Sequence, residues 1–219
     1  MTDIAPSFPP TFLVPIGHDV GPYRPDPSAD QYRFRVRVGA RIVESDQLGF
    51  AIWLLAHDTE RGLPNRTSVL DAAANLGLSR ADTAVTLETL LADGLLAQVE
   101  PGTLREFAES HQLMPLMVGL GPDRTDPEAR VAGLLDIPVV QMTAAMYDLW
   151  VWSHLRPNLW LACVDAAAAE LDAGATEPDR VEPEQVLFGL LSAVHPLLAS
   201  RAACLDARHT QENERTAAA

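Results

Sequence analysis

Residues 75–99, NLGLSRADTAVTLETLLADGLLAQV, decide the fold of this chain because they combine a helix end, a turn, a second helix and a strand. Gly77 ends a run of good helix formers that begins near Val69. Ser79 and Asp82 have the spacing of a capped helix start. The apolar stripe of the second helix consists of Leu87, Leu90 and Leu91.

The flanking residues complete a unit of three helices and a short strand. From Ser45, the expected N-cap, apolar residues recur at helical spacing to about Ala56. Downstream, Asp93-Gly94 ends the last helix, and residues 95–99 are expected to form a strand that turns at Pro101-Gly102.

This order of elements resembles the winged helix-turn-helix superfamily of regulators. The resemblance rests on Leu76-Gly77-Leu78-Ser79-Arg80 followed by Asp93-Gly94-Leu95-Leu96, and it covers about 60 residues, 43–100. It implies a mainly α fold with short β wings, of the α+β class. It also implies DNA binding through the helix at residues 79–92.

A second copy of the unit is expected further along the chain. Residues 48–57 can be laid over residues 145–154, which places Trp53 over Trp150 and His57 over His154. Chance matching in a chain rich in Ala and Leu is the alternative. The predicted domains are a proline-rich flexible arm (1–31), a winged helix-turn-helix unit (32–102), a linker helix and loop (103–130), a second, degenerate winged-helix-like unit (131–205) and a disordered tail (206–219).

The charge of the chain argues against DNA as its partner. The formal net charge is -14, and over residues 43–100 three arginines oppose nine carboxylates. Arg80 is the only cation among the outward positions of the predicted reading helix. A protein partner or self-association is therefore favoured, and DNA is a disfavoured alternative. The candidate partner-binding residues are Arg80, Asp82, Val85 and Glu88.

Residues 32–38 alternate polar and apolar side chains, which predicts a half-buried strand with arginines on one face. These guanidinium groups are candidates for contacts to phosphates or carboxylates. On the outer face of an edge strand, arginine also deters sheet-to-sheet aggregation, which is the alternative interpretation. The candidates are Arg33, Arg35, Arg37 and Arg41.

Aromatic residues are densest where the predicted second unit begins. They are expected to fill the core, but two tryptophans lie two positions apart, and a helix cannot bury both equally. One of them is therefore a candidate for an interface or a ligand pocket. The candidate set is Tyr147, Trp150, Trp152 and Trp160.

We find no motif of a reaction centre, so the sequence predicts no enzyme, no cofactor and no metal. Gly119-Leu120-Gly121-Pro122 is the glycine cluster most similar to a phosphate-binding loop. It is expected to form a turn because Pro122 has no N–H to offer a phosphate.

His57 and His154 are expected at helix ends, where an imidazolium meets the negative end of the helix dipole. Cys163 and Cys204 lie far apart, which fits a reducing compartment; with no signal peptide and no apolar span, a cytoplasmic location and no membrane contact are expected.

These patterns favour a non-enzymatic regulatory or adaptor protein that binds protein through tandem winged-helix-like units. The alternative is a winged-helix transcription regulator that binds DNA. A third hypothesis is a regulator that senses a small molecule in the tryptophan-rich region.

Overall fold

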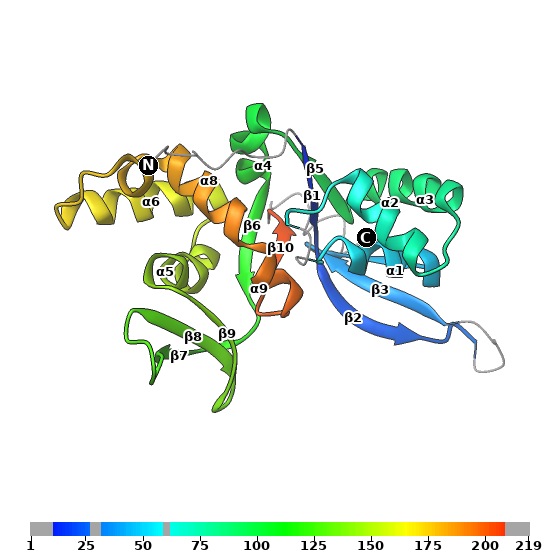
Figure 1. Cartoon of the computed structure of the whole chain (residues 1–219), viewed down its shortest axis with the longest axis horizontal. Helices are drawn as coiled ribbons and strands as arrows, with labels where there is room; N and C mark the ends of the chain where they lie inside the picture. The colour runs from blue at the N-terminus through cyan, green and yellow to red at the C-terminus, as the bar shows by residue number, and fades with distance from the viewer. Residues whose placement is uncertain (1–10, 27–31, 59–61, 209–219) are drawn as a thin grey trace.

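The chain folds into two halves that repeat the same order of elements, and they lie side by side in Figure 1. The structure is a computed structural model that describes residues 11–26, 32–58 and 62–208. In each half a leading strand precedes a three-stranded antiparallel sheet and then helices. A final strand returns to pair with the leading strand.

The first half begins with β1 (Phe12–Pro15). Its sheet has the order β2-β3-β4, with β2 at His18–Tyr23, β3 at Arg33–Val38 and β4 at Arg41–Ser45. The helices that follow are α1 (Gln47–Leu55), α2 (Arg66–Asn75) and α3 (Arg80–Ala92). Finally, β5 (Leu96–Val99) pairs antiparallel with β1.

The second half follows a short connection, η1 (Pro101–Thr103) and α4 (Leu104–Ser110). Its leading strand is β6 (His111–Pro115), and its sheet joins β7 (Val118–Pro122), β8 (Ala129–Leu134) and β9 (Ile137–Thr143). The helices are α5 (Ala144–Trp152), η2 (Ser153–Leu155), α6 (Leu159–Asp172), α7 (Pro178–Val181), α8 (Pro183–Ala193) and α9 (His195–Ala199). Lastly, β10 (Ala203–Ala207) pairs antiparallel with β6.

The expectation of a mainly α fold is wrong. About 46% of the described residues are helical and 28% lie in strands, which form four small antiparallel sheets. The strand content was missed because several strands carry glycine or proline, such as Gly21-Pro22 in β2 and Gly121-Pro122 in β7. These residues weaken the local strand signal, and the partner strand supplies the order instead.

The internal repeat begins earlier than the sequence predicted. Leu13 and Pro15 of β1 lie in the same strand positions as Leu113 and Pro115 of β6. Both three-stranded sheets also have a register shift at the same place, between Asp19 and Gly21 in one and between Gly119 and Gly121 in the other. Gly21 and Gly121 have positive φ angles of 95° and 82°, a conformation that glycine adopts without strain. The second copy therefore starts at β6.

The predicted domain boundaries need revision for the same reason. Strands β1 and β2 lie within the segment expected to be a flexible arm, and β1 is buried. The expected linker contains β6 and β7, and Asp206 of the expected tail belongs to β10. Residues 1–10, 27–31 and 209–219 lie outside the described residues.

Local sequence signals place the ends of the first three helices. The N-cap of α1 is Asp46, one residue beyond the expected Ser45, and its side chain accepts a hydrogen bond from the Gly49 amide. Ser79 caps α3 as predicted. Gly77 follows α2, and its φ of 79° permits the left-handed turn that ends the helix.

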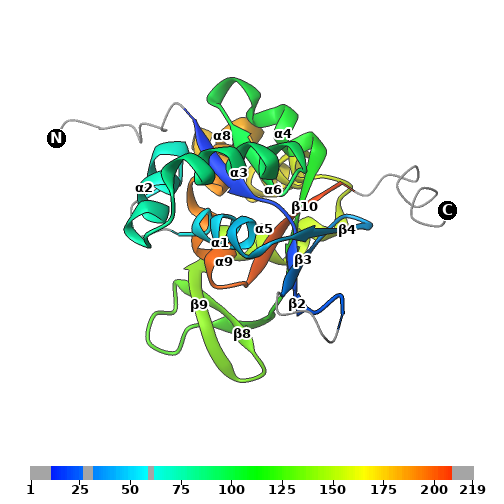
Figure 2. The ribbon, with the colours of Figure 1, turned by 90° about the vertical axis from the view of Figure 1, so that its right-hand side faces the viewer.

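The two halves share one hydrophobic core. The end of β1 forms a parallel bridge from Ile16 to Leu205 of β10, and the Gly17 amide donates a 2.7 Å hydrogen bond to the Leu205 carbonyl. The sheet β7-β8-β9 projects from this body, as Figures 1 and 2 show. No helix in the described residues has the length and apolarity needed to cross a membrane.

Candidate functional site

The exposed face of α3 carries the four predicted partner-binding residues. Ser79 caps the helix, while Thr83, Leu87 and Leu90 anchor its opposite face in the core. The side chain of Val85 is 69% exposed. Arg80, Asp82, Val85 and Glu88 are all exposed on α3, but Arg80 and Asp82 are two positions apart and so point to different sides of the helix.

The protein's own carboxylates already pair with the cations of this surface. The Arg80 guanidinium lies 2.6 Å from the Asp71 carboxylate on α2. Arg66 of α2 pairs with Glu88, and this hydrogen bond lowers the pKa of the Glu88 carboxyl. The surface offers a phosphate little unpaired positive charge.

The strand arginines also make contacts within the chain. Arg35 stacks on the Tyr23 ring at 3.4 Å and lies 3.5 Å from the Glu44 carboxylate. Arg37 pairs with Asp206, and Arg41 donates to the Asp93 carbonyl. Arg33 is exposed and has no ion-pair partner among the described residues. The strand is central in the order β2-β3-β4, so the interpretation of an edge strand is wrong.

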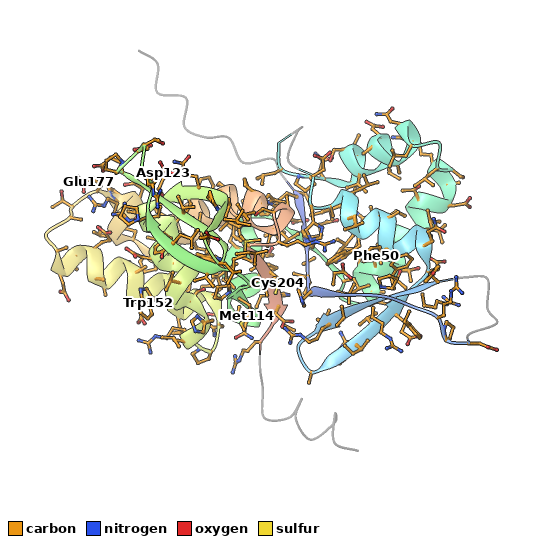
Figure 3. The ribbon with its side chains drawn as sticks, turned by 90° about the horizontal axis from the view of Figure 1, so that it is seen from below. Phe50, Met114, Asp123, Trp152, Glu177 and Cys204 are labelled. Atoms are coloured by element: carbon orange, nitrogen blue, oxygen red, sulfur yellow. The ribbon has the colours of Figure 1, made fainter. Side chains whose placement is uncertain are left out.

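The predicted aromatic set does not line one pocket. Trp150 is buried and donates to the Ala202 carbonyl at 2.9 Å, and the Tyr147 ring lies beside it with centroids 5.6 Å apart. Trp160 is half-buried beneath the Arg105 guanidinium. Trp152 alone is largely exposed, at 61%, on the outer part of the second half in Figure 3. The helix thus buries one tryptophan and exposes the other, as its spacing indicated.

Sequence reasoning missed the most exposed apolar feature of the described chain, the turn between β8 and β9. Leu134, Leu135 and Ile137 are 54%, 84% and 63% exposed. Nearby strand residues Val118 and Val139 are also exposed. Large apolar side chains gathered at the end of a projecting hairpin are typical of a binding surface. The signal available in the sequence was the apolar pair Leu134-Leu135 beside Asp136.

The β8–β9 turn differs from the equivalent β3–β4 turn of the first half in the residue at its first position. Gly39-Ala40 joins β3 to β4, and Gly39 has a φ of 57°. Leu135 holds the same first position between β8 and β9 with a φ of 55°. Two-residue hairpin turns require this left-handed conformation, which glycine adopts freely and leucine adopts at a cost of roughly 1 to 2 kcal/mol. The chain therefore keeps a strained, exposed leucine where its other half has glycine.

The two turns also differ in their surroundings. The Gly39 amide donates a 2.5 Å hydrogen bond to the Asp206 carboxylate of β10, so the first turn is held against the second half. The β8–β9 turn lies at the free end of the projecting sheet β7-β8-β9. The second turn is thus open to another molecule.

A hollow of about 290 Å³ lies at the junction of the halves, and it brings together polar residues that are distant in the sequence. Asp19 and Arg201 form a 3.2 Å ion pair there.

His57 also lines this hollow. Burial lowers the pKa of His57 to about 4, and its Nδ1 lies 2.9 Å from the Trp53 carbonyl. His57 is therefore a neutral donor to its own helix, and the expected imidazolium at this helix end is wrong. Figure 3 places Cys204, which also lines the hollow, between the halves.

Comparisons with known proteins assign no family. No family model matches the chain, and neither a curated protein nor a solved structure matches it. Within residues 11–26, 32–58 and 62–208 no group of three or more His, Cys, Asp or Glu side chains could hold a metal ion.

Proposed function

We propose that this chain is a non-enzymatic regulatory or adaptor protein that binds another protein, or a second copy of itself, through the turn between β8 and β9. The observation that carries the proposal is the left-handed, 84% exposed Leu135 at the β8–β9 turn. A strained backbone conformation that does not help to hold the fold together is characteristic of binding sites. There, contact with a partner offsets the energetic cost of the strain.

The contact surface is apolar and stands away from the body of the molecule. Leu134 and Ile137 flank Leu135, so a partner that covers the turn buries three large side chains together. Burying a side chain of this kind contributes roughly 1.5 to 3 kcal/mol. The exposed face of α3 with Val85 is a second, weaker apolar surface.

A DNA-binding regulator is the second candidate, and the order α2, turn, α3 and β5 supports it. Charge opposes it. Arg35, Arg37, Arg66 and Arg80 already contact a carboxylate of the chain. Phosphate binding has to break these pairs on a chain whose net charge is -14.

The experiment compares the chain with two variants in pull-downs from native lysate, together with sedimentation velocity of the purified protein. Leu135→Gly removes the exposed side chain and relieves the left-handed strain, so it should raise the free energy of unfolding by about 1 kcal/mol while partner or self-association is lost. Leu171→Ala is the matched control, because Leu171 is 60% exposed on α6, away from the turn.

The outcomes separate the candidates. Binding that is lost with Leu135→Gly and kept with Leu171→Ala supports the proposal. If Leu135→Gly binds as well as the unaltered chain, the turn is not the binding surface. Co-purified nucleic acid that is released by salt, and lost on replacing Arg33, Arg35 and Arg37 by Ala, would instead establish the DNA-binding alternative.

A further inference from the structure

A groove runs between α5, α6 and α8 in the second half, on a surface separate from the β8–β9 turn. Its volume is about 310 Å³, in the range of pockets that take small organic ligands. Leu149 and Leu190 form a buried floor, and Met146 and Val186 are half-buried beside them. The walls are small residues: Ala145, Ala166, Ala169, Gly189 and Ala193.

The helices of the first half pack differently from those that form the groove. There α3 packs against both α1 and α2, whereas α8 packs mainly against α6 and α7. Leu48 on α1 packs against the core, and the repeat places Ala145 at the equivalent position on α5. In the second half a small side chain therefore lines the groove at this position.

Gly189 keeps this space open at a cost to the helix. It lies in the interior of α8, where glycine is less stable than alanine by roughly 0.5 to 1 kcal/mol. A Cβ atom added at Gly189 would meet nothing within 4 Å, so no neighbouring element requires glycine there. A side chain at this position would instead narrow the groove.

The rim of the groove is acidic. Glu170 is paired with Arg180, whereas Asp148 and Asp179 take part in no ion pair with the described residues. Two uncompensated carboxylates repel an anionic ligand and attract a cation. The apolar floor requires an apolar body on the same ligand.

We propose that this groove binds a small organic cation, an amine or ammonium compound with an apolar body that lies over Leu149 and Leu190. The positive group lies between Asp148 and Asp179 at the mouth. The walls of Ala and Gly give the ligand close approach to the helix backbones.

The experiment uses three probes of similar size: phenylbutylammonium, phenylbutyrate and phenylbutanol. Each is titrated into the full chain by calorimetry, with thermal unfolding as a second readout. The ammonium probe should bind about tenfold more tightly than the carboxylate probe, with the alcohol between them. The ammonium probe should also raise Tm.

Variants locate the site. Asp148→Asn with Asp179→Asn should weaken the ammonium probe and leave the alcohol unchanged, whereas Asp172→Asn, outside the groove on α6, should change neither. Gly189→Leu should raise Tm without ligand and abolish binding of all three probes, which distinguishes a filled groove from a misfolded protein.

Two results would overturn the proposal. One is equal affinity for the ammonium and carboxylate probes. The other is unchanged ammonium binding in a folded Gly189→Leu variant. Because the β8–β9 turn is not part of the groove, Leu135→Gly should leave probe binding intact, so this proposal and the protein-binding proposal can fail independently.

Discussion

The guanidinium of Arg37 on β3 lies 3.1 Å from the carboxylate of Asp206 on β10, and this ion pair joins the two halves of the chain. The Asp206 side chain is 1% exposed and also accepts the Gly39 amide, whereas the Arg37 side chain is 34% exposed. A carboxylate this deeply buried is stable only while its partners remain.

Replacing Arg37 by Met should therefore lower the free energy of unfolding by about 3 kcal/mol, because it leaves Asp206 buried without its counter-charge. Urea unfolding measures the change. Arg35→Met is the control, since Arg35 pairs with a half-exposed Glu44 and should cost about 1 kcal/mol or less. In the double variant Arg37→Met, Asp206→Asn, which removes the buried charge and keeps an oxygen to accept the Gly39 amide, much of the loss should be recovered. Purely additive losses would contradict a coupled pair.

Stability should fall as the solution becomes acidic, starting near pH 6.5. Burial lowers the pKa of His57 from 6.5 to about 4, so between these values the unfolded chain binds a proton that the folded chain does not. The free energy of unfolding should then drop by about 3 kcal/mol on account of His57 as the pH falls through this window. Burial lowers the pKa values of His111 and His195 as well, so they act in the same direction. Urea unfolding at several pH values should show that the free energy of unfolding depends less steeply on pH in His57→Gln than in the unaltered chain. An unchanged pH dependence would contradict this role of His57.

Neither cysteine should react with thiol reagents while the protein is folded. Burial raises the pKa of Cys163 and of Cys204 to about 12, and the side chains are buried, so little thiolate is present or accessible. Maleimide labelling followed by mass spectrometry should find both thiols unmodified in buffer and both modified in urea. Rapid labelling of native Cys204 alone would show that the hollow at the junction opens.

The two equivalent tryptophans should differ in their contribution to stability. The indole of Trp53 donates to the Ile16 carbonyl at 3.2 Å, and no other described residue donates to that oxygen. The indole of Trp150 donates to the Ala202 carbonyl, which also accepts the Leu116 amide. Trp53→Phe leaves a buried acceptor unpaired and should cost about 2 kcal/mol, measured by thermal unfolding. Trp150→Phe should cost less, and a larger loss would contradict this account.

Much of the first half could be predicted from the sequence because its signals are local. Gly77 and Ser79 end one helix and begin the next through contacts within a single turn of chain. The leucine stripe of α3 predicted its buried face in the same way. The overlay of Trp53 on Trp150 indicated the repeat, although not where it begins.

The candidate binding surface could not be predicted in the same way. Gly39 and Leu135 occupy equivalent turns, and only the folded arrangement shows that the first is covered by β10 while the second is exposed. Arg35 and Arg37 of β3 likewise have partners on other strands, which strand periodicity does not reveal.

The sequence by itself determined the helices of the first half, the acidity of the chain and the presence of an internal repeat. These depend on residue type and on neighbours a few positions away. Only the tertiary structure decided which strands pair, that Arg37 and Asp206 join the halves, and that Leu135 is left uncovered. The physical reason is that sheet pairing, burial and charge compensation depend on segments that are distant in the sequence and meet only when the chain folds. Contacts of this kind leave no local pattern in the sequence.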